Sequence, residues 1–313
     1  MKYTFIILFG LSVHLCFSQT IKPAQIDSLI DGIKKTVLEN YVLTDKANLI
    51  SYSLTARHYA GISSIDSLTK KLNDDLFKLS DDKHLFLQYR PEVAENLIKQ
   101  KDIHKEQDKK EKKEHYGFEQ ADVIGNNIGY IKLKYFADAT HAQKAVLKYT
   151  SRLKNTSAII FDLRENFGGS GTMIQLLAGI FLPTDQEEIL KINYKTQDDV
   201  TLKSTQIDPT QKITHQPIYI LVSSQTFSAG EAFTLIMKNR GRATIIGEST
   251  AGAGNVAGPY PVTSQFVLTV PVGIIVDPKT NVGWEHTGVT PDITVSADLA
   301  MDKAIELITS GTK

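Results

Sequence analysis

A serine lies where an apolar run gives way to helical spacing, in SSQTFSAGEAFTLI at residues 223–236. The preceding IYILV is typical of a buried strand. Ser228 and Glu231 match the S-x-x-E pattern of a capping box, which satisfies free amides at a helix start. A serine at a sharp strand-to-helix turn also exposes its oxygen beside amides that stabilise negative charge, as a nucleophile requires. Both interpretations fit this segment, and a cap is the commoner of the two.

Paired glycines follow a second strand-like run, in DLRENFGG at residues 162–169. Glycines let the backbone approach a ligand and aim amides at it, which is what an oxyanion hole needs. The alternative is a glycine-rich turn in which Asp162 and Arg164 form a structural pair. The segment does not predict a phosphate loop, because the chain contains neither G-x-x-x-x-G-K-[ST] nor a G-x-G-x-x-G after a strand.

A serine nucleophile needs a base, and His84 is the best placed of the eight histidines. It follows two aspartates and a lysine and precedes LFLQY, where helical sequence meets a strand-like run. His286 lies late in the chain beside Glu285, which could orient an imidazole or be surface charge. The other six lie near the N-terminus, in a charged segment or in polar surroundings. A lone histidine is more often structural or exposed, so none of these residues defines a site alone.

Two regions of different character must position these residues. Apolar side chains keep helical spacing from residue 24 to 79, which predicts a small helical domain over 19–90. We take the charged stretch 91–116 as a linker. Over 117–313, apolar strands alternate with helical segments, which predicts an α/β core whose mainly parallel sheet is covered on both faces. Ligands in such folds collect at the carboxyl ends of the strands, where we expect Ser228 to lie.

Composition limits the classes of function. The chain has 313 residues with 35 basic and 35 acidic side chains, so no global charge favours nucleic acid or an anionic membrane. Residues 1–18 combine Lys2 with an apolar stretch, which predicts a signal peptide and a periplasmic, cell-envelope or secreted protein. The only cysteine, Cys16, lies in that segment, so we expect no disulfide in the mature chain. No later stretch could span a bilayer.

Five segments, taken together and in order, resemble the C-terminal processing peptidases, a family that includes the tricorn core and the repeats of interphotoreceptor retinoid-binding protein. The segments are DDKHL, DLRENFGG, TFSAGE, IIGESTAGAGN and WEHTGVTPDITV. The similarity covers residues 41–295, and five landmarks at compatible spacing are more specific than any one of them. It implies a crotonase-like, ClpP-like α/β peptidase core with a small N-terminal helical domain. Many members carry a PDZ domain between the two, but roughly 30 residues at that place are too few for a domain.

The resemblance also implies a set of catalytic residues. The processing peptidases have a lysine in a T-x-G-K-G segment, where this chain has TAGAG with Ala253 in the lysine's place. The match is therefore to the tricorn and retinoid-binding branch, which implies Ser228 as nucleophile, His84 as general base and Glu285 as distal acid. Tricorn has a serine just before the histidine, where this chain has Lys83. A direct contact between His84 and Glu285, or a water, would have to replace that serine.

An oxyanion hole completes the implied site. The resemblance assigns it to the amides of Ala229 and of Gly169, with Gly168 as the alternative to Gly169. His84 would take the proton of the serine hydroxyl, the amides would hold the tetrahedral oxyanion, and His84 would then protonate the leaving amine. This chemistry requires no metal and no cofactor.

The sequence thus favours an exported serine endopeptidase whose partner is a protein or peptide substrate. The alternative is a non-catalytic carrier of an apolar ligand such as a retinoid or a fatty acid, because the retinoid-binding relatives use the same fold. A carrier would need none of Ser228, His84 and Glu285, which is why we favour hydrolysis. Acyl-CoA chemistry, suggested by a crotonase-like core alone, conflicts with export because CoA substrates are cytoplasmic. The sequence leaves the oligomeric state open.

Overall fold

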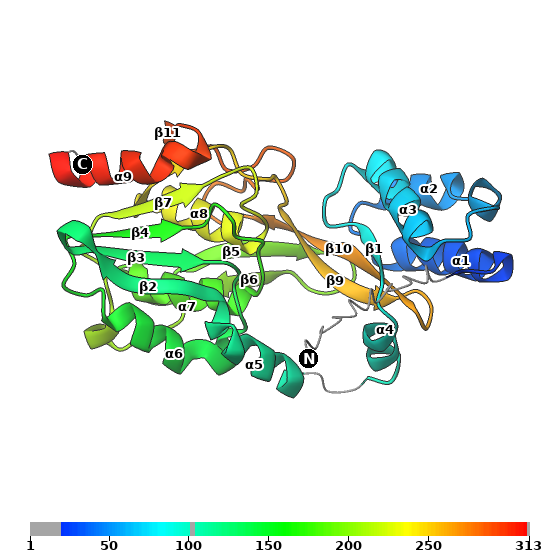
Figure 1. Cartoon of the computed structure of the whole chain (residues 1–313), viewed down its shortest axis with the longest axis horizontal. Helices are drawn as coiled ribbons and strands as arrows, with labels where there is room; N and C mark the ends of the chain where they lie inside the picture. Colours follow the sequence, from blue (N-terminus) through cyan, green and yellow to red (C-terminus); the bar gives the residue numbers. More distant parts are fainter. Residues whose placement is uncertain (1–19, 101–103, 312–313) are drawn as a thin grey trace, which may run out of the picture.

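The computed structural model describes residues 20–100 and 104–311; the expected signal peptide and Cys16 lie outside the described residues. The described chain forms a helical unit, a mixed α/β core and a second sheet that joins them (Figure 1). The helical unit consists of α1 (Pro23–Asn40), α2 (Thr44–Ser53), the 3-10 turn η1 (Ala56–Tyr59) and α3 (Ile65–Ser80).

Each helix of this unit has an apolar stripe and defined ends, as α3 illustrates. Ser64 caps its start by accepting a hydrogen bond from the Ser67 amide. Its buried side chains recur at helical spacing as Leu68, Leu72 and Leu76. The helix ends at Asp81, whose left-handed conformation (φ 55°) turns the chain toward the segment that contains His84.

The core is built on the predicted mainly parallel sheet. Its strand order is β11-β8-β7-β4-β3-β2, with parallel pairing from β11 to β3 and an antiparallel β2 at one edge. The inner strands are short apolar runs buried on both faces, which is why they read as continuous rather than alternating hydrophobic segments. The strands are β2 (Phe118–Ile124), β3 (Ile128–Leu133), β4 (Ala158–Asp162), β7 (Ile218–Val222), β8 (Ala243–Gly247) and β11 (Ile293–Thr294).

Helices cover both faces of this sheet. On one face, side chains such as Phe161 pack with α6 (Ala139–Ser151), α7 (Gly171–Phe181) and α8 (Ala229–Asn239). On the other face, Ile160 packs with α9 (Ala300–Ser310). The two-faced covering predicted from the sequence is therefore confirmed. Short 3-10 turns complete the core: η3 (Gly125–Asn127), η4 (Pro209–Gln211) and η5 (Ala297–Leu299).

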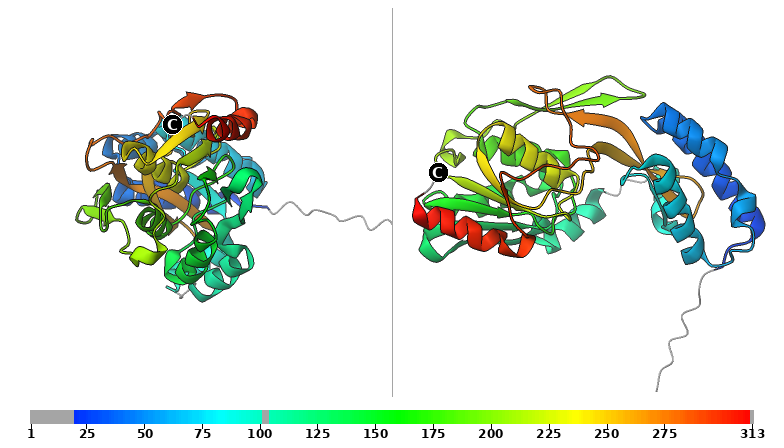
Figure 2. Two further views of the ribbon diagram at one scale, coloured as in Figure 1. Left: turned by 90° about the vertical axis from the view of Figure 1, so that its left-hand side faces the viewer. Right: turned by 90° about the horizontal axis from the view of Figure 1, so that it is seen from above.

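A second, antiparallel sheet connects the core to the helical unit. Its order is β1-β10-β5-β6, and β9 also pairs with β10. The first part of β10 pairs with β1, where Leu87 faces Leu268, and its last part pairs with β5. The helices of the unit and α9 therefore lie at opposite ends of the molecule, joined by β9 and β10 (Figure 2). The strands are β1 (Phe86–Tyr89), β5 (Glu188–Tyr194), β6 (Val200–Lys203), β9 (Asn255–Pro261) and β10 (Phe266–Val276).

The apolar core of the helical unit includes residues from β10, far along the chain. Leu87, Leu268 and Val270 are all buried with the helices of the unit. The charged stretch expected to be a linker contains α4 (Pro91–Ile98), α5 (His104–Lys113) and η2 (His115–Gly117), and α4 packs against β9. Within the ranges described above, no helix is long and apolar enough to cross a membrane.

Candidate active site

Ser228 occupies a strained turn between β7 and α8. Its φ of 50° and ψ of −114° are values that a residue with a side chain rarely adopts. Glu231 Oε2 accepts the Ser228 amide at 2.8 Å, and the capping box predicted from S-x-x-E is present. Strain of this kind clusters at functional sites, and a serine on a sharp strand-to-helix turn is the geometry of a nucleophile elbow. The capping and chemical interpretations of the segment are therefore compatible.

Glu231 also fixes the loop of TAGAG, which contains Ala253. Its carboxylate accepts the Thr250 hydroxyl at 2.6 Å and the amides of Gly252 and Ala253 at 2.6 and 2.9 Å. Burial raises the pKa of Glu231, although these donors act in the opposite direction. Ala253, the residue that the resemblance matches to a lysine, is fully buried. The Lys83 ammonium donates to the carbonyl of Ala251 in the same loop.

Gly168 and Gly169 lie directly against Ser228 and the strand end next to it. A Cβ at Gly168 would lie 2.8 Å from Ser228 Cβ, and a Cβ at Gly169 would lie 2.2 Å from the Phe136 carbonyl oxygen. Both glycines have positive φ, 93° and 134°. Only glycine fits such close approaches in this conformation. The second strand-to-turn segment singled out in the sequence therefore meets the Ser228 turn.

Two backbone amides at this junction have no acceptor within the described residues. They belong to Gly169 and to Ala229, the first residue of α8, whose amide lies before the intrahelical hydrogen bonds begin. The Gly168 amide, in contrast, donates to Asn166 Oδ1 at 2.9 Å. Asn166 is fully buried and also donates to the Leu133 carbonyl at 2.7 Å. This side chain, which sequence analysis missed, aims the glycine segment at Ser228.

His84 reaches the site from the helical unit. It lies between α3 and β1, is buried, and packs its ring at 4.8 Å from the ring of Phe227, the residue before Ser228. Burial lowers the pKa of His84, and the negative charge of Asp82 partly opposes that shift. Its Nδ1 atom is buried and has no hydrogen-bond partner among the described residues. His84 thus places a largely desolvated imidazole at the cavity that Ser228 also lines.

Glu285 also has a buried polar atom without a hydrogen-bond partner among the described residues. Its Oε2 accepts the amide of Gly254, whereas Oε1 is buried and has no hydrogen-bond partner in the described part of the chain. Burial, and then the charge of Asp82, raise the pKa of Glu285 to about 7. The neighbouring His286 is half exposed, with Nδ1 at 3.5 Å from Asp81 Oδ2 and 4.0 Å from Glu285 Oε1. His286 does not line the cavity that contains Ser228.

One cavity of about 270 Å³ brings these groups together. Ser228, His84, Gly169 and Ala229 line it, whereas Glu285, the residue after the lining residue Trp284, does not. Most of the remaining wall is apolar, and local sequence patterns do not predict it because its residues come from separate strands and helices. These residues include Ile174, Leu190, Ile192, Leu202, Ile275 and Trp284.

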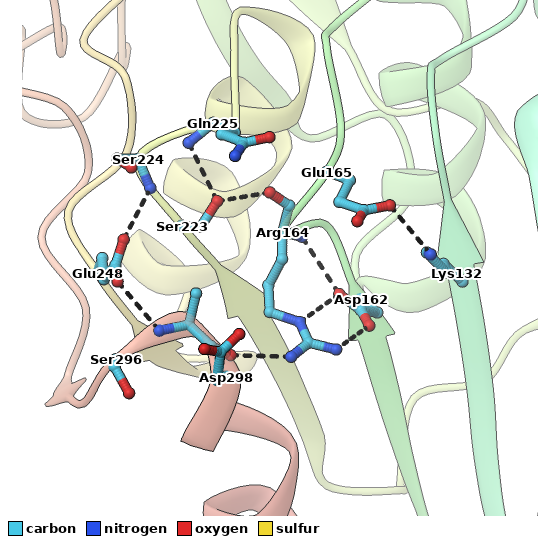
Figure 3. A pocket seen from close by; sticks show the side chains of 11 residues that line it. Lys132, Asp162, Arg164, Glu165, Ser223, Ser224, Gln225, Glu248, Ser296 and Asp298 are labelled. Atoms are coloured by element: carbon cyan, nitrogen blue, oxygen red, sulfur yellow. Dashed lines mark hydrogen bonds and ion pairs between the residues drawn. The ribbon is translucent and has the colours of Figure 1, made fainter.

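A separate polar pocket of about 410 Å³ lies at the carboxyl ends of β4 and β7 (Figure 3). Arg164 Nη2 pairs with Asp162 Oδ2 at 2.6 Å, and Lys132 pairs with Glu165 at 3.1 Å. The structural pairing considered for Asp162 and Arg164 is therefore confirmed, and it coexists with the glycine turn at Ser228. The described residues contain no group of three or more histidine, cysteine or acidic side chains that could hold a metal.

Comparison with known proteins assigns the family. Residues 127–295 match the model of peptidase family S41, and residues 22–117 match the N-terminal domain of peptidase S41 in eukaryotic IRBP. The first match alone covers more than half of the chain. The chain therefore belongs to peptidase family S41, whose named relatives below are proteases. The resemblance stated from the five sequence segments is confirmed.

Individual relatives agree with this assignment. The chain is 26% identical to a carboxyl-terminal-processing protease of Synechocystis over 200 residues, which are 60% of this chain and 45% of that protein. It is 28% identical to the carboxy-terminal processing protease CtpA of Bacillus subtilis over 176 residues, 55% of this chain and 36% of that protein. Each match thus spans less than half of the relative's length.

Solved structures share the fold over nearly the whole chain. A lipoprotein from Streptococcus agalactiae superposes with a TM-score of 0.61 at 17% identity, covering 91% of this chain and 96% of that one. A candidate peptidase from Parabacteroides merdae gives a TM-score of 0.60 at 16% identity, covering 92% and 97%. At these identities the likeness concerns the fold alone.

Proposed function

We propose that this chain is a serine endopeptidase that uses Ser228 as nucleophile, His84 as general base and Glu285 as the distal acid. The observation that carries the proposal is the strained turn of Ser228, which faces one cavity together with the desolvated imidazole of His84. Membership of peptidase family S41 supports the same reaction. The carbonyl oxygen of the substrate would lie at the free amides of Gly169 and Ala229.

The reaction follows from this arrangement. The Ser228 O–H bond breaks as Oγ bonds to the substrate carbonyl carbon, and His84 takes the proton. The electron pair of the carbonyl double bond moves to its oxygen, where the two amides donate to it. When the C–N bond breaks, His84 gives its proton to the leaving amine. Water then attacks the carbonyl carbon of the acyl-enzyme while His84 takes a proton from it, and His84 returns that proton to Ser228 Oγ as the ester bond breaks. Glu285 would orient the imidazole of His84 as the distal acid, and its Oε1 has no hydrogen-bond partner among the described residues in the resting structure.

The proposed substrate is a protein or peptide, handled by a crotonase-like core without metal or cofactor. The size of the cavity favours this over an apolar carrier. At about 270 Å³ it is smaller than the roughly 300–1,000 Å³ of sites that enclose a drug-sized ligand. It suits one side chain of a longer substrate. Export, proposed from residues 1–18, would place the enzyme in the periplasm, the cell envelope or the medium.

A serine-reactive fluorophosphonate tests the proposal directly. We expect a single adduct by intact mass on the wild type, and a loss of labelling rate by about four orders of magnitude in Ser228→Ala and in His84→Ala. Ser224→Ala is the matched control, because Ser224 lies in the polar pocket and not in the cavity. A folded wild type that forms no adduct, or an adduct that survives in Ser228→Ala, would overturn the proposal.

A further inference from the structure

Asp82 is a buried carboxylate two residues before His84. It is only 1% exposed and accepts hydrogen bonds from three groups in different parts of the molecule. The Tyr41 hydroxyl donates at 3.1 Å, the Asn255 amide group at 3.1 Å, and the backbone amide of His84 at 2.9 Å. Asp82 lies in the DDKHL segment of the resemblance, but the expected set of site residues does not include it.

These three contacts place Asp82 at the junction of the two units. Tyr41 follows α1 in the helical unit, whereas Asn255 begins β9 and lines the cavity. The contact to the His84 amide fixes the backbone that carries the proposed base. One side chain therefore connects His84 both to the helices from which it comes and to the cavity wall on which it acts.

The partners of Asp82 are neutral. Among the described residues, no lysine or arginine side chain forms an ion pair with it. Moving an uncompensated carboxylate out of water is costly, and hydrogen bonds from neutral donors offset only part of that cost. Asp82 nevertheless lies beside a histidine with only 1% of its surface exposed. A role in supporting the fold alone does not explain why a carboxylate occupies this buried position.

We propose that Asp82 is a positioning residue that holds His84 at the cavity and whose charge stabilises the imidazolium formed when His84 takes the Ser228 proton. This inference rests on the proposed function of His84 as the base. Asp82 does not touch the substrate in this scheme; it acts only through His84. Asp82 assists the step in which the Ser228 hydroxyl proton moves to the imidazole of His84 while Ser228 Oγ bonds to the substrate carbonyl carbon.

Other titratable groups around the site are less suited to this role. Glu285 has a pKa raised to about 7, so near neutral pH a large fraction of it carries no charge. Glu231 is engaged by Ser228 and by the loop of Ala253. Burial raises the pKa of Tyr41, which therefore stays a neutral donor, and the Lys83 ammonium is directed to a carbonyl.

The test is the pH dependence of fluorophosphonate labelling on the full chain. A negative charge near an imidazole favours its protonated form, so removing it lowers the pKa of the base. We expect the acid limb of the labelling rate to move down by about one pH unit in Asp82→Asn. The rate on the alkaline plateau should also fall several-fold, because the imidazolium loses its support.

Asp75→Asn is the matched control. Asp75 also accepts from a tyrosine, Tyr59, at 2.8 Å in the same helical unit, but its partners Tyr59 and Lys71 do not line the cavity. Its substitution should change stability and leave the midpoint of the labelling profile where it is. An Asp82→Asn profile with the wild-type midpoint would overturn the inference while leaving the proposed function intact. A wild type that does not label overturns the proposed function itself.

Tyr41→Phe keeps the inference testable if Asp82→Asn does not fold. This change removes one donor to Asp82 and keeps its charge, and Tyr41 does not line the cavity. We expect slower labelling on the plateau with a midpoint that is not lowered, because positioning loosens while the charge remains. Labelling at the wild-type rate over the whole pH range, or a lowered midpoint, would overturn the inference.

Discussion

Glu231 and Glu285 are two carboxylates near Ser228 that differ in their hydrogen-bond partners. Glu231 accepts four donors, from Ser228, Thr250, Gly252 and Ala253, and so serves as a structural anchor. Glu285 accepts the Gly254 amide with Oε2, whereas Oε1 has no partner within the described residues. Burial raises the pKa of both carboxyl groups, and for Glu285 the charge of Asp82 adds to this effect and brings the pKa to about 7. Glu285 is therefore the acid whose protonation changes near neutral pH.

This difference predicts a pH-dependent effect of Glu285→Gln on stability. The pKa of Glu285 rises from its ordinary 4.5 to about 7 on folding, so its protonated form is favoured in the folded state. The stability it contributes is present below pH 4.5 and is lost as the pH rises through 7. A neutral glutamine avoids that loss. We expect the variant to exceed the wild type at pH 8 by at most on the order of 3 kcal/mol, and to match it at pH 4.

Urea unfolding of both proteins at the two pH values measures this prediction. Glu306→Gln on α9 is the control, because Glu306 is 65% exposed and its substitution should leave the pH dependence unchanged. An equal difference between Glu285→Gln and the wild type at pH 4 and pH 8 would show that Glu285 does not take up a proton on folding.

At the scale of elements, the site forms where two turns meet at the strand ends of one sheet. The turn after β4 brings Gly168 and Gly169, and the turn after β7 brings Ser228. The Phe227 amide donates to the Asn166 carbonyl at 2.9 Å and joins the two turns directly. The position of the proposed oxyanion donors thus depends on backbone packing that leaves no room for a Cβ.

Gly169→Ala tests that dependence. The new methyl group would meet the Phe136 carbonyl oxygen at 2.2 Å in a left-handed conformation, so the turn must shift. We expect fluorophosphonate labelling to slow by about a hundred-fold or more, the typical effect of losing one oxyanion donor. Gly125→Ala is the control, since a Cβ there meets nothing within 4 Å. Equal labelling of the two variants would argue against the Gly169 amide as a donor.

The sequence predicts those elements whose side chains repeat a simple local pattern. The apolar runs that become β4, β7 and β8, and the helix after Ser228, follow from periodicity alone. The strand β9 has Gly258, Pro259 and Pro261 in NVAGPYP, which contradict strand propensity; its antiparallel pairing with the next strand, β10, makes it a strand. Asn166 and Asp82 were likewise missed, because their partners are distant in the chain.

At the scale of the whole molecule, β10 determines where His84 lies relative to Ser228. It is an eleven-residue strand whose first part completes the core of the helical unit and whose last part belongs to the sheet beside the cavity. The relative placement of the two units therefore depends on a continuous strand rather than on a flexible connection. The sequence could not show this, because local patterning does not indicate which residues pair across nearly 180 positions.

Leu268→Ala tests the role of this strand. Leu268 is fully buried in β10 opposite Leu87, so truncation leaves a cavity in the core of the helical unit. We expect a loss of roughly 2–5 kcal/mol in the free energy of unfolding, together with slower labelling of Ser228. Leu49→Ala, at a position 45% exposed on α2, should change neither. If Leu268→Ala is destabilised but labels at the wild-type rate, the packing of β10 in the helical unit does not affect the reactivity of Ser228.

The course of β10 also constrains when a newly made chain acquires a working site. His84 and β1 leave the ribosome about 180 residues before the strand that must cover Leu87, an interval of roughly 10–35 seconds at ordinary rates of synthesis. During that time the helices of the unit lack part of their core, and the imidazole has no cavity wall behind it. Glu285 emerges later still. The proposed catalytic groups therefore come together only after the last strand of the second sheet has paired, so we do not expect a nascent chain to hydrolyse its neighbours.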